Sequence, residues 1–261
     1  MTAMDLRKRR YLEAMGIQVW VPRGIAAPAL ENESPPAVEH PPVFVEEAHT
    51  ALIPAAKPAP PVLAPGAELN DPQVATMDWD TLTARVAKCT RCPELVANRT
   101  QTVFGVGDRS APLMVIGEAP GQEEDKQGEP FVGRAGQLLN EMLRAIGFPR
   151  ERVYIANVLK SRPPNNRDPK PEEAARCEPY LKRQVALIQP RLILSVGRVS
   201  AQNLLKTDTP IGKLRDRVHS YQGIPLVVTY HPAYLLRSPQ EKRKAWDDLK
   251  LALRTLREPT P

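Results

Sequence analysis

The chain has few cysteines and no long apolar run, and each shortage excludes a class of protein. Three of its 261 residues are cysteines, an odd number that argues against a disulfide framework. No apolar run approaches the ~20 residues needed to span a bilayer. No secretory cleavage pattern follows the basic start at residues 7–10. We therefore expect a cytoplasmic protein with no membrane contact.

Charge is distributed unevenly along the chain. The net charge is +6, but residues 1–80 hold 6 basic and 11 acidic side chains, a balance of −5. Residues 81–261 hold the other 30 basic and 19 acidic side chains, a balance of +11. A basic domain behind an acidic leader favours a polyanionic partner such as nucleic acid, although many soluble domains are simply basic.

Composition divides the chain into three segments. Residues 1–23 predict a short helix followed by an extended anchor. Residues 24–75 are rich in proline and alanine and predict a disordered linker. Residues 76–258 have the regular apolar pattern of a folded domain. The first segment is either an anchor that packs on this domain or a tethered motif that binds a protein partner.

Four short apolar runs alternate with helical patterns in the folded domain. Each run is typical of a strand that is buried on both faces, which occurs in parallel sheets. We therefore predict an α/β fold, a three-layer α/β/α sandwich around a central, mostly parallel four-stranded sheet. The predicted strands cover residues 113–116, 153–155, 192–194 and 226–228.

Polar residues follow three of the four predicted strands. Glu118 stands after the first strand, Asn157 after the second, Gly197 after the third and His231 after the fourth. Ligands of parallel sheets bind beyond the carboxyl ends of the strands, so these positions predict one pocket. The glycines of residues 117–133 match no phosphate-binding spacing, and neighbouring carboxylates would repel phosphate.

Several motifs agree in order and spacing over residues 80–256. They are Gly117-Glu118-Ala119-Pro120-Gly121, Pro130-Phe131-Val132-Gly133, Asn157-Val158-Leu159-Lys160, Arg162-Pro163-Pro164-Asn165-Asn166-Arg167 and His231-Pro232-Ala233-Tyr234-Leu235-Leu236-Arg237. Together this set resembles the family 4 uracil-DNA glycosylases, the iron–sulfur-containing branch. The resemblance implies a monomeric base-excision-repair enzyme that flips uracil out of DNA and hydrolyses its N-glycosidic bond.

The resemblance also implies roles for individual residues. His231 would donate a hydrogen bond to uracil O2 as negative charge develops there. Either Glu118 or Glu124 would orient the attacking water or stabilise the sugar cation, with Glu118 slightly favoured. Asn157 would complement O4 and N3–H of uracil, and Phe131 would stack on the base. Backbone groups of the same loop complete the predicted substrate site, at Ala119 and Gly121.

Flipping a base costs a few kcal/mol and requires contacts that hold the opened DNA. An apolar residue would fill the gap in the base stack, and basic residues would bind phosphates. These side chains could alternatively form only a solvated rim. The predicted DNA contacts are Lys160, Arg162, Arg167, Leu235 and Arg237.

Cys89, Cys92 and Cys177 match three of the four cysteines that hold a [4Fe–4S] cluster in the family. Ser161 stands at the fourth position, and its oxygen is a harder ligand than a thiolate. Three arrangements stay open: a serine alkoxide ligand, a water ligand, or loss of one iron to leave a [3Fe–4S] cluster. The alternative is that the cluster is gone and the cysteines are inert or bind zinc.

Two other functions compete with the glycosylase. One is a non-catalytic iron–sulfur DNA-binding module associated with replication or repair. The other is a redox protein that uses the Cys-x-x-Cys pair, but no second cofactor motif accompanies it. The complete set of Glu118, Phe131, Asn157 and His231 favours the glycosylase over both.

Overall fold

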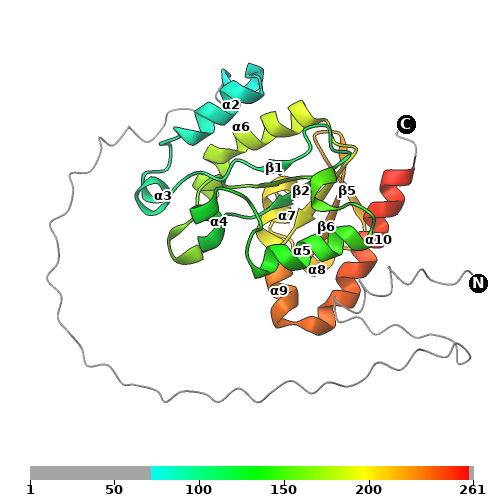
Figure 1. Cartoon of the computed structure of the whole chain (residues 1–261). Coiled ribbons are helices and arrows are strands. Elements are labelled where there is room, and N and C mark those ends of the chain that lie inside the picture. The colour runs from blue at the N-terminus through cyan, green and yellow to red at the C-terminus, as the bar shows by residue number, and fades with distance from the viewer. Residues whose placement is uncertain (1–71, 259–261) are drawn as a thin grey trace, which may run out of the picture. The chain divides into compact units, whose positions relative to one another are not determined.

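The computed structural model describes residues 72–258, which form an α/β domain (Figure 1). The predicted anchor over residues 1–23 lies outside the described residues, as does nearly all of the predicted linker over residues 24–75. The domain boundary at residue 76 therefore stays a prediction. Within the described range, no helix is both long enough and apolar enough to cross a membrane.

The sheet has six strands in the order β1-β3-β2-β4-β6-β5. Its four inner strands are parallel, which confirms the predicted core. They are β2 (Leu113–Gly117), β3 (Tyr154–Asn157), β4 (Leu192–Val196) and β6 (Ile224–Thr229). Two antiparallel edge strands, β1 (Val106–Gly107) and β5 (Val218–Tyr221), were not predicted.

Nine α-helices connect and cover the strands within the described range. The longest is α6 (Pro171–Ile188). Helix α2 (Trp79–Ala87) begins after Asp78, whose carboxylate accepts a hydrogen bond from Thr81 N at 2.8 Å. The others are α3 (Pro93–Asn98), α4 (Gln122–Gln127), α5 (Arg134–Ala145), α7 (Arg198–Leu205), α8 (Ile211–Leu214), α9 (Pro232–Arg237) and α10 (Lys242–Arg257). Short 3-10 turns cover Val74–Thr76, Arg150–Arg152, Pro164–Asn166 and Pro239–Glu241.

The strands bury apolar side chains on both faces, and this produces the three layers. In β2, Leu113 and Val115 pack with α5 and α10, while Met114 and Ile116 pack with α6 and α7. Figure 1 shows α5 and α6 on opposite sides of the sheet. Because side chains alternate along a strand, a wholly apolar run satisfies both layers at once. The predicted α/β/α architecture is confirmed.

A buried ion pair supports the segment that leads to His231. Arg215 donates to both carboxylate oxygens of Asp248 on α10, at 2.7 and 2.9 Å. The Arg215 guanidinium also lies over the ring of Tyr230, 4.4 Å from its centroid. Both members of the pair are buried, so the Arg215 guanidinium is stabilised by Asp248 and the Tyr230 ring rather than by water. This arrangement fixes the backbone immediately before His231.

Candidate active site

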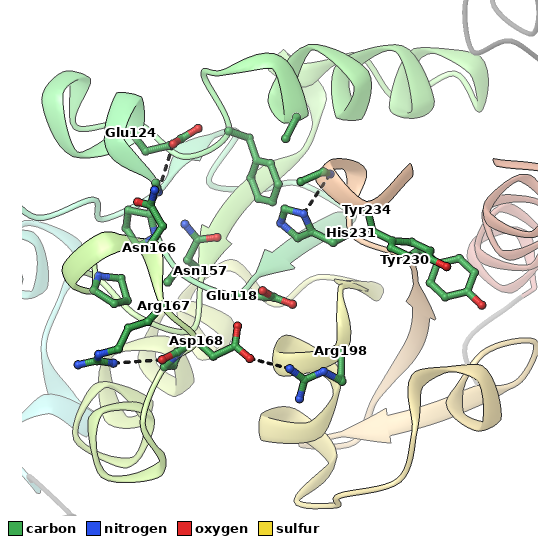
Figure 2. Close-up of a pocket in the computed structure, with 18 of the residues that line it drawn as sticks. Glu118, Glu124, Asn157, Asn166, Arg167, Asp168, Arg198, Tyr230, His231 and Tyr234 are labelled. Atoms are coloured by element: carbon green, nitrogen blue, oxygen red, sulfur yellow. Dashed lines mark hydrogen bonds and ion pairs between the residues drawn. The ribbon is translucent and has the colours of Figure 1, made fainter. Parts of the chain in front are cut away.

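A cleft of about 810 Å³ opens at the carboxyl edge of the parallel strands. It brings together nine of the predicted site residues: Glu118, Ala119, Gly121, Glu124, Phe131, Asn157, Arg167, His231 and Arg237. Figure 2 shows the labelled side chains of Glu118, Asn157 and His231 converging on one space. The predicted pocket is therefore present as a geometric site.

Asn157 presents a polar atom that has no hydrogen-bond partner among residues 72–258. The residue ends β3 and is 2% exposed, and its Oδ1 is buried without a hydrogen bond. A Cβ atom at Gly117 would lie 2.4 Å from this oxygen and 2.7 Å from the Phe131 ring, so only glycine leaves room for both side chains. A buried amide oxygen without a partner costs free energy, and a ligand that donates to it removes that cost.

Phe131 forms one wall of the same space. Its ring lies 5.6 Å from the His231 ring, at an interplanar angle of 30°. Its backbone has φ of 55°, a left-handed conformation that is costly for an aromatic residue. Such strain persists only where the surrounding structure enforces it, which is common at functional sites.

His231 is fixed in position and in tautomer. It caps the N-terminus of α9, where its Nδ1 accepts a hydrogen bond from Ala233 N at 3.2 Å. In the neutral ring the proton is therefore on Nε2, which remains available as a donor. Burial, and next the positive charge of Arg237, lower the pKa of His231 to about 4. The ring is therefore a neutral donor near pH 7.

Glu118 follows β2 and lines the cleft next to the loop that starts α7. Its Oε1 accepts a hydrogen bond from Val199 N at 3.2 Å. A Cβ atom at Gly197 would lie 2.4 Å from the same oxygen, and Gly197 has φ of +102°, so glycine is required there for two reasons. Burial raises the pKa of Glu118 above its usual range.

Glu124 is engaged differently from Glu118. Its Oε1 accepts from Val132 N at 3.0 Å and from Gly133 N at 3.2 Å, while Oε2 accepts from Gly121 N at 3.2 Å. Both carboxylate oxygens are thus bonded to backbone amides of two different loops. Glu124 joins these loops around the Phe131 side of the cleft.

Two residues predicted to contact DNA, Lys160 and Leu235, are buried instead. Lys160 is 2% exposed, and its ammonium group donates to Asn157 O at 2.9 Å and to Gln184 Oε1 at 2.7 Å. Leu235 is 1% exposed and packs in the core between α5 and α10. Neither side chain is available to DNA, because one is satisfied inside the domain and the other fills its core.

The two predicted arginines of the loop after β3 differ in their surroundings. Arg162 is half-buried and donates to Asn166 Oδ1 at 2.7 Å. Arg167 makes a bidentate pair with Glu173, at 2.6 and 2.9 Å, and a second pair with Glu94 at 3.2 Å. Two carboxylates therefore neutralise Arg167, although it lines the cleft.

The three cysteines gather where α3 begins and α6 passes. Burial raises the pKa of the Cys177 thiol to about 12 and also raises the pKa of Cys92, and the nearby Cys89 thiol adds to both effects. Ser161 is 5% exposed, and Arg99 donates both to its Oγ at 2.7 Å and to Cys89 O at 2.6 Å. The residues fit an iron–sulfur cluster by ligand type at three positions and not at the fourth.

No group of three or more His, Cys, Asp or Glu side chains within residues 72–258 is arranged to hold a single metal ion.

The cleft also includes residues outside the predicted motifs, among them Asp168, Arg198 and Tyr230. Arg198 directly follows Gly197, so its place beyond a strand end was a usable signal. Asp168 has no such signal, because it reaches the cleft only through the path of the loop after β3. Tyr230 and Tyr234 pack against each other, with ring centroids 5.1 Å apart.

Comparison with known proteins adds to this geometry. The sequence model of the uracil DNA glycosylase superfamily matches residues 104–250. The type-4 uracil-DNA glycosylase of Archaeoglobus fulgidus is 44% identical over 179 residues, which cover 66% of this chain and 89% of that protein. Its counterpart in Thermotoga maritima is 44% identical over 177 residues, 66% of this chain and 92% of that protein. That of Pyrobaculum aerophilum is 40% identical over 185 residues, covering 67% and 93%.

The surroundings of His231 predict its titration. In NMR spectra recorded against pH, the ring signal that disappears in His231→Gln should titrate with a midpoint near 4, because burial and Arg237 disfavour the cation. In the urea-unfolded chain the same ring should titrate near pH 6.5, as an exposed histidine does. A midpoint of ~6 or higher in the folded protein would contradict the neutral-donor assignment.

Proposed function

The chain belongs to the type-4 group of the uracil-DNA glycosylase superfamily, and we propose that its cleft extrudes uracil from DNA and hydrolyses the N-glycosidic bond there. The unpartnered Asn157 Oδ1 carries this proposal, because it lies buried beside an aromatic wall and a neutral histidine donor. This combination suits a planar base that donates a hydrogen bond to Asn157 and develops negative charge on an oxygen near His231.

Asn157 reads the edge of uracil in this proposal. Its Oδ1 accepts from N3–H, and its Nδ2 donates to O4. Cytosine has the reverse pattern, an acceptor at N3 and a donor at N4, so it leaves the buried amide mismatched. Leaving such a buried group unpaired discriminates strongly between substrates. Phe131 stacks on the ring of the base that enters.

His231 stabilises the leaving group. As the bond between C1′ and N1 breaks, its electron pair moves onto the uracil ring and toward O2. The Nε2–H of neutral His231 donates to that oxygen, while Ala233 N holds the ring in place through Nδ1. A neutral donor keeps its proton, so uracil departs as a hydrogen-bonded anion.

Glu118 acts on the other product, the sugar. A water oxygen bonds to C1′ as positive charge develops there, and the water then loses a proton to the carboxylate or to solvent. Glu118 is favoured over Glu124 for this role. Glu118 accepts one backbone hydrogen bond, from Val199 N, and can still accept one from water, whereas Glu124 already accepts three backbone hydrogen bonds. Glu124 instead supports the loop that contains Ala119 and Gly121, whose backbone forms the base site.

Residues of α9 hold the opened DNA. Tyr234 and Leu236 are each 37% exposed and can reach the base stack, whereas Leu235 is 1% exposed and cannot. Arg237 lines the cleft, where it binds a phosphate of the strand that enters. Arg162, on the loop after β3, adds positive charge near the strand, whereas Arg167 is neutralised by Glu173 and Glu94.

The wider setting is also part of the proposal. The enzyme works as a monomer in the cytoplasm, in base excision repair. The segment over residues 1–23 recruits a protein partner.

An iron–sulfur cluster completes the proposed domain. Cys89, Cys92 and Cys177 hold it by three thiolates, and Ser161 occupies the fourth position. When bound, the cluster supplies a rigid link between the segment around Cys89 and α6. It has no step in the hydrolysis.

Excision from a uracil-containing oligonucleotide tests the function. Wild-type protein followed by alkali should break the strand at uracil, and His231→Ala should slow excision by ~10²–10³-fold because one donor to the developing anion is lost. His219→Ala is the matched control, since its ring contacts Leu214 O outside the cleft, and it should cleave at a rate close to wild type.

Binding of the His231→Ala protein to DNA that carries an abasic analogue should stay near the wild-type level. Wild-type protein that breaks neither single- nor double-stranded uracil DNA would overturn the glycosylase and favour the non-catalytic module.

Ser161→Cys tests the cluster. A fourth thiolate should raise the iron and sulfide content per chain and lengthen the lifetime of the visible absorption band, because thiolates bind these clusters more strongly than oxygen. Ser161→Ala, which also removes the hydroxyl but adds no thiolate, is the matched control and should give no increase. Iron content and absorption that are the same in Ser161→Cys and wild type would contradict the proposal.

A further inference from the structure

The cleft extends well beyond the base site. Its volume of about 810 Å³ lies within the ~300–1,000 Å³ of sites that hold whole drug-sized ligands, whereas uracil is a single small ring. The lining of the cleft also includes Pro169, Ile211 and an ion pair between Asp168 and Arg198. None of these four residues contacts the base in the glycosidic step described above.

The ion pair connects two strand ends across the cleft. Arg198 begins α7 beyond β4, and Asp168 belongs to the loop beyond β3. Arg198 Nη2 donates to Asp168 Oδ2 at 2.6 Å, and Figure 2 shows the pair on the Glu118 side of the site. Gln202, one turn further along α7, accepts from Arg198 Nη1 at 3.2 Å and so orients the guanidinium.

This pair is exposed, unlike the other arginine pair of the cleft. The side chains of Arg198 and Asp168 are 51% and 64% exposed, while the Glu173 partner of Arg167 is 4% exposed. Exposed pairs contribute only ~0–1 kcal/mol, so another anion can replace Asp168 at little cost. Arg167 is held by two carboxylates and does not exchange in this way.

We propose that Arg198 binds a backbone phosphate next to the extruded uracil, and that Asp168 occupies this arginine until the phosphate displaces it. A guanidinium binds a phosphate in the same bidentate geometry as a carboxylate, and more negative charge then faces it. The proposal rests on the proposed glycosylase function, which supplies the DNA strand. Arg198 would then bind the nucleic-acid backbone, and Asp168 would compete with the phosphate for it. Both residues are separate from those that contact the base.

The test measures DNA binding in the full chain by fluorescence anisotropy. The ligand is a labelled single strand with a tetrahydrofuran abasic analogue, which the enzyme cannot process, titrated at several salt concentrations. Arg198→Gln should weaken binding and reduce the slope of log Kobs against log salt by ~0.7, the value for one phosphate on a single strand. Asp168→Asn should tighten binding by about two- to fivefold, the equivalent of one exposed ion pair.

A double variant separates exchange from simple charge removal. In the Arg198→Gln background, Asp168→Asn should have no further effect, because the arginine that it releases is absent. Asp247→Asn is the matched control: it removes the same charge from an exposed pair with Lys250 on α10, outside the cleft, and should leave binding unchanged.

Two results would overturn the proposal. One is an unchanged salt slope in Arg198→Gln. The other is equal tightening by Asp168→Asn with and without Arg198, which would mean that Asp168 acts only as a repelling charge. Excision of uracil by the same wild-type preparation reports on the glycosylase independently of either outcome.

Discussion

The active site depends on one constraint of the fold: all four inner strands run parallel and end at the same edge of the sheet. Glu118, Asn157 and His231 come from three different strand ends, and Gly197 at the fourth leaves the space that Glu118 occupies. None of these residues is near another in the sequence. The parallel pairing of the core strands therefore brings the site residues together at one edge of the sheet.

Around this edge several features are unfavourable in the free energy of the ligand-free protein. Asn157 Oδ1 is buried without a partner, Phe131 has a left-handed backbone, and burial lowers the pKa of His231 to about 4. The Glu124 carboxylate, through its three backbone hydrogen bonds, helps the loops to bear this strain. Such preorganisation means that donors and acceptors do not have to rearrange when charge develops on the base.

The sequence predicted the parallel core well because the runs at residues 113–116, 153–155, 192–194 and 226–228 are wholly apolar, a pattern typical of strands in parallel sheets. It did not predict β1 and β5, since β1 has only two residues and β5 alternates without a clear apolar face. The motif residues of the cleft were found through strand ends and family resemblance. Lys160 and Leu235 were misassigned because burial depends on tertiary partners: Gln184 satisfies the lysine, and the short helix α9 turns Leu235 rather than Leu236 into the core.

Selection of uracil depends on the buried amide of Asn157, whose Oδ1 has no hydrogen-bond partner among residues 72–258. The most direct measurement is an NMR titration of the free bases, following the side-chain NH₂ of Asn157 and the ring signals of His231. Uracil should shift both sets of signals in a saturable way, and cytosine at the same concentrations should leave them unchanged. Equal shifts with cytosine, or no shift of the Asn157 amide with uracil, would contradict the claim.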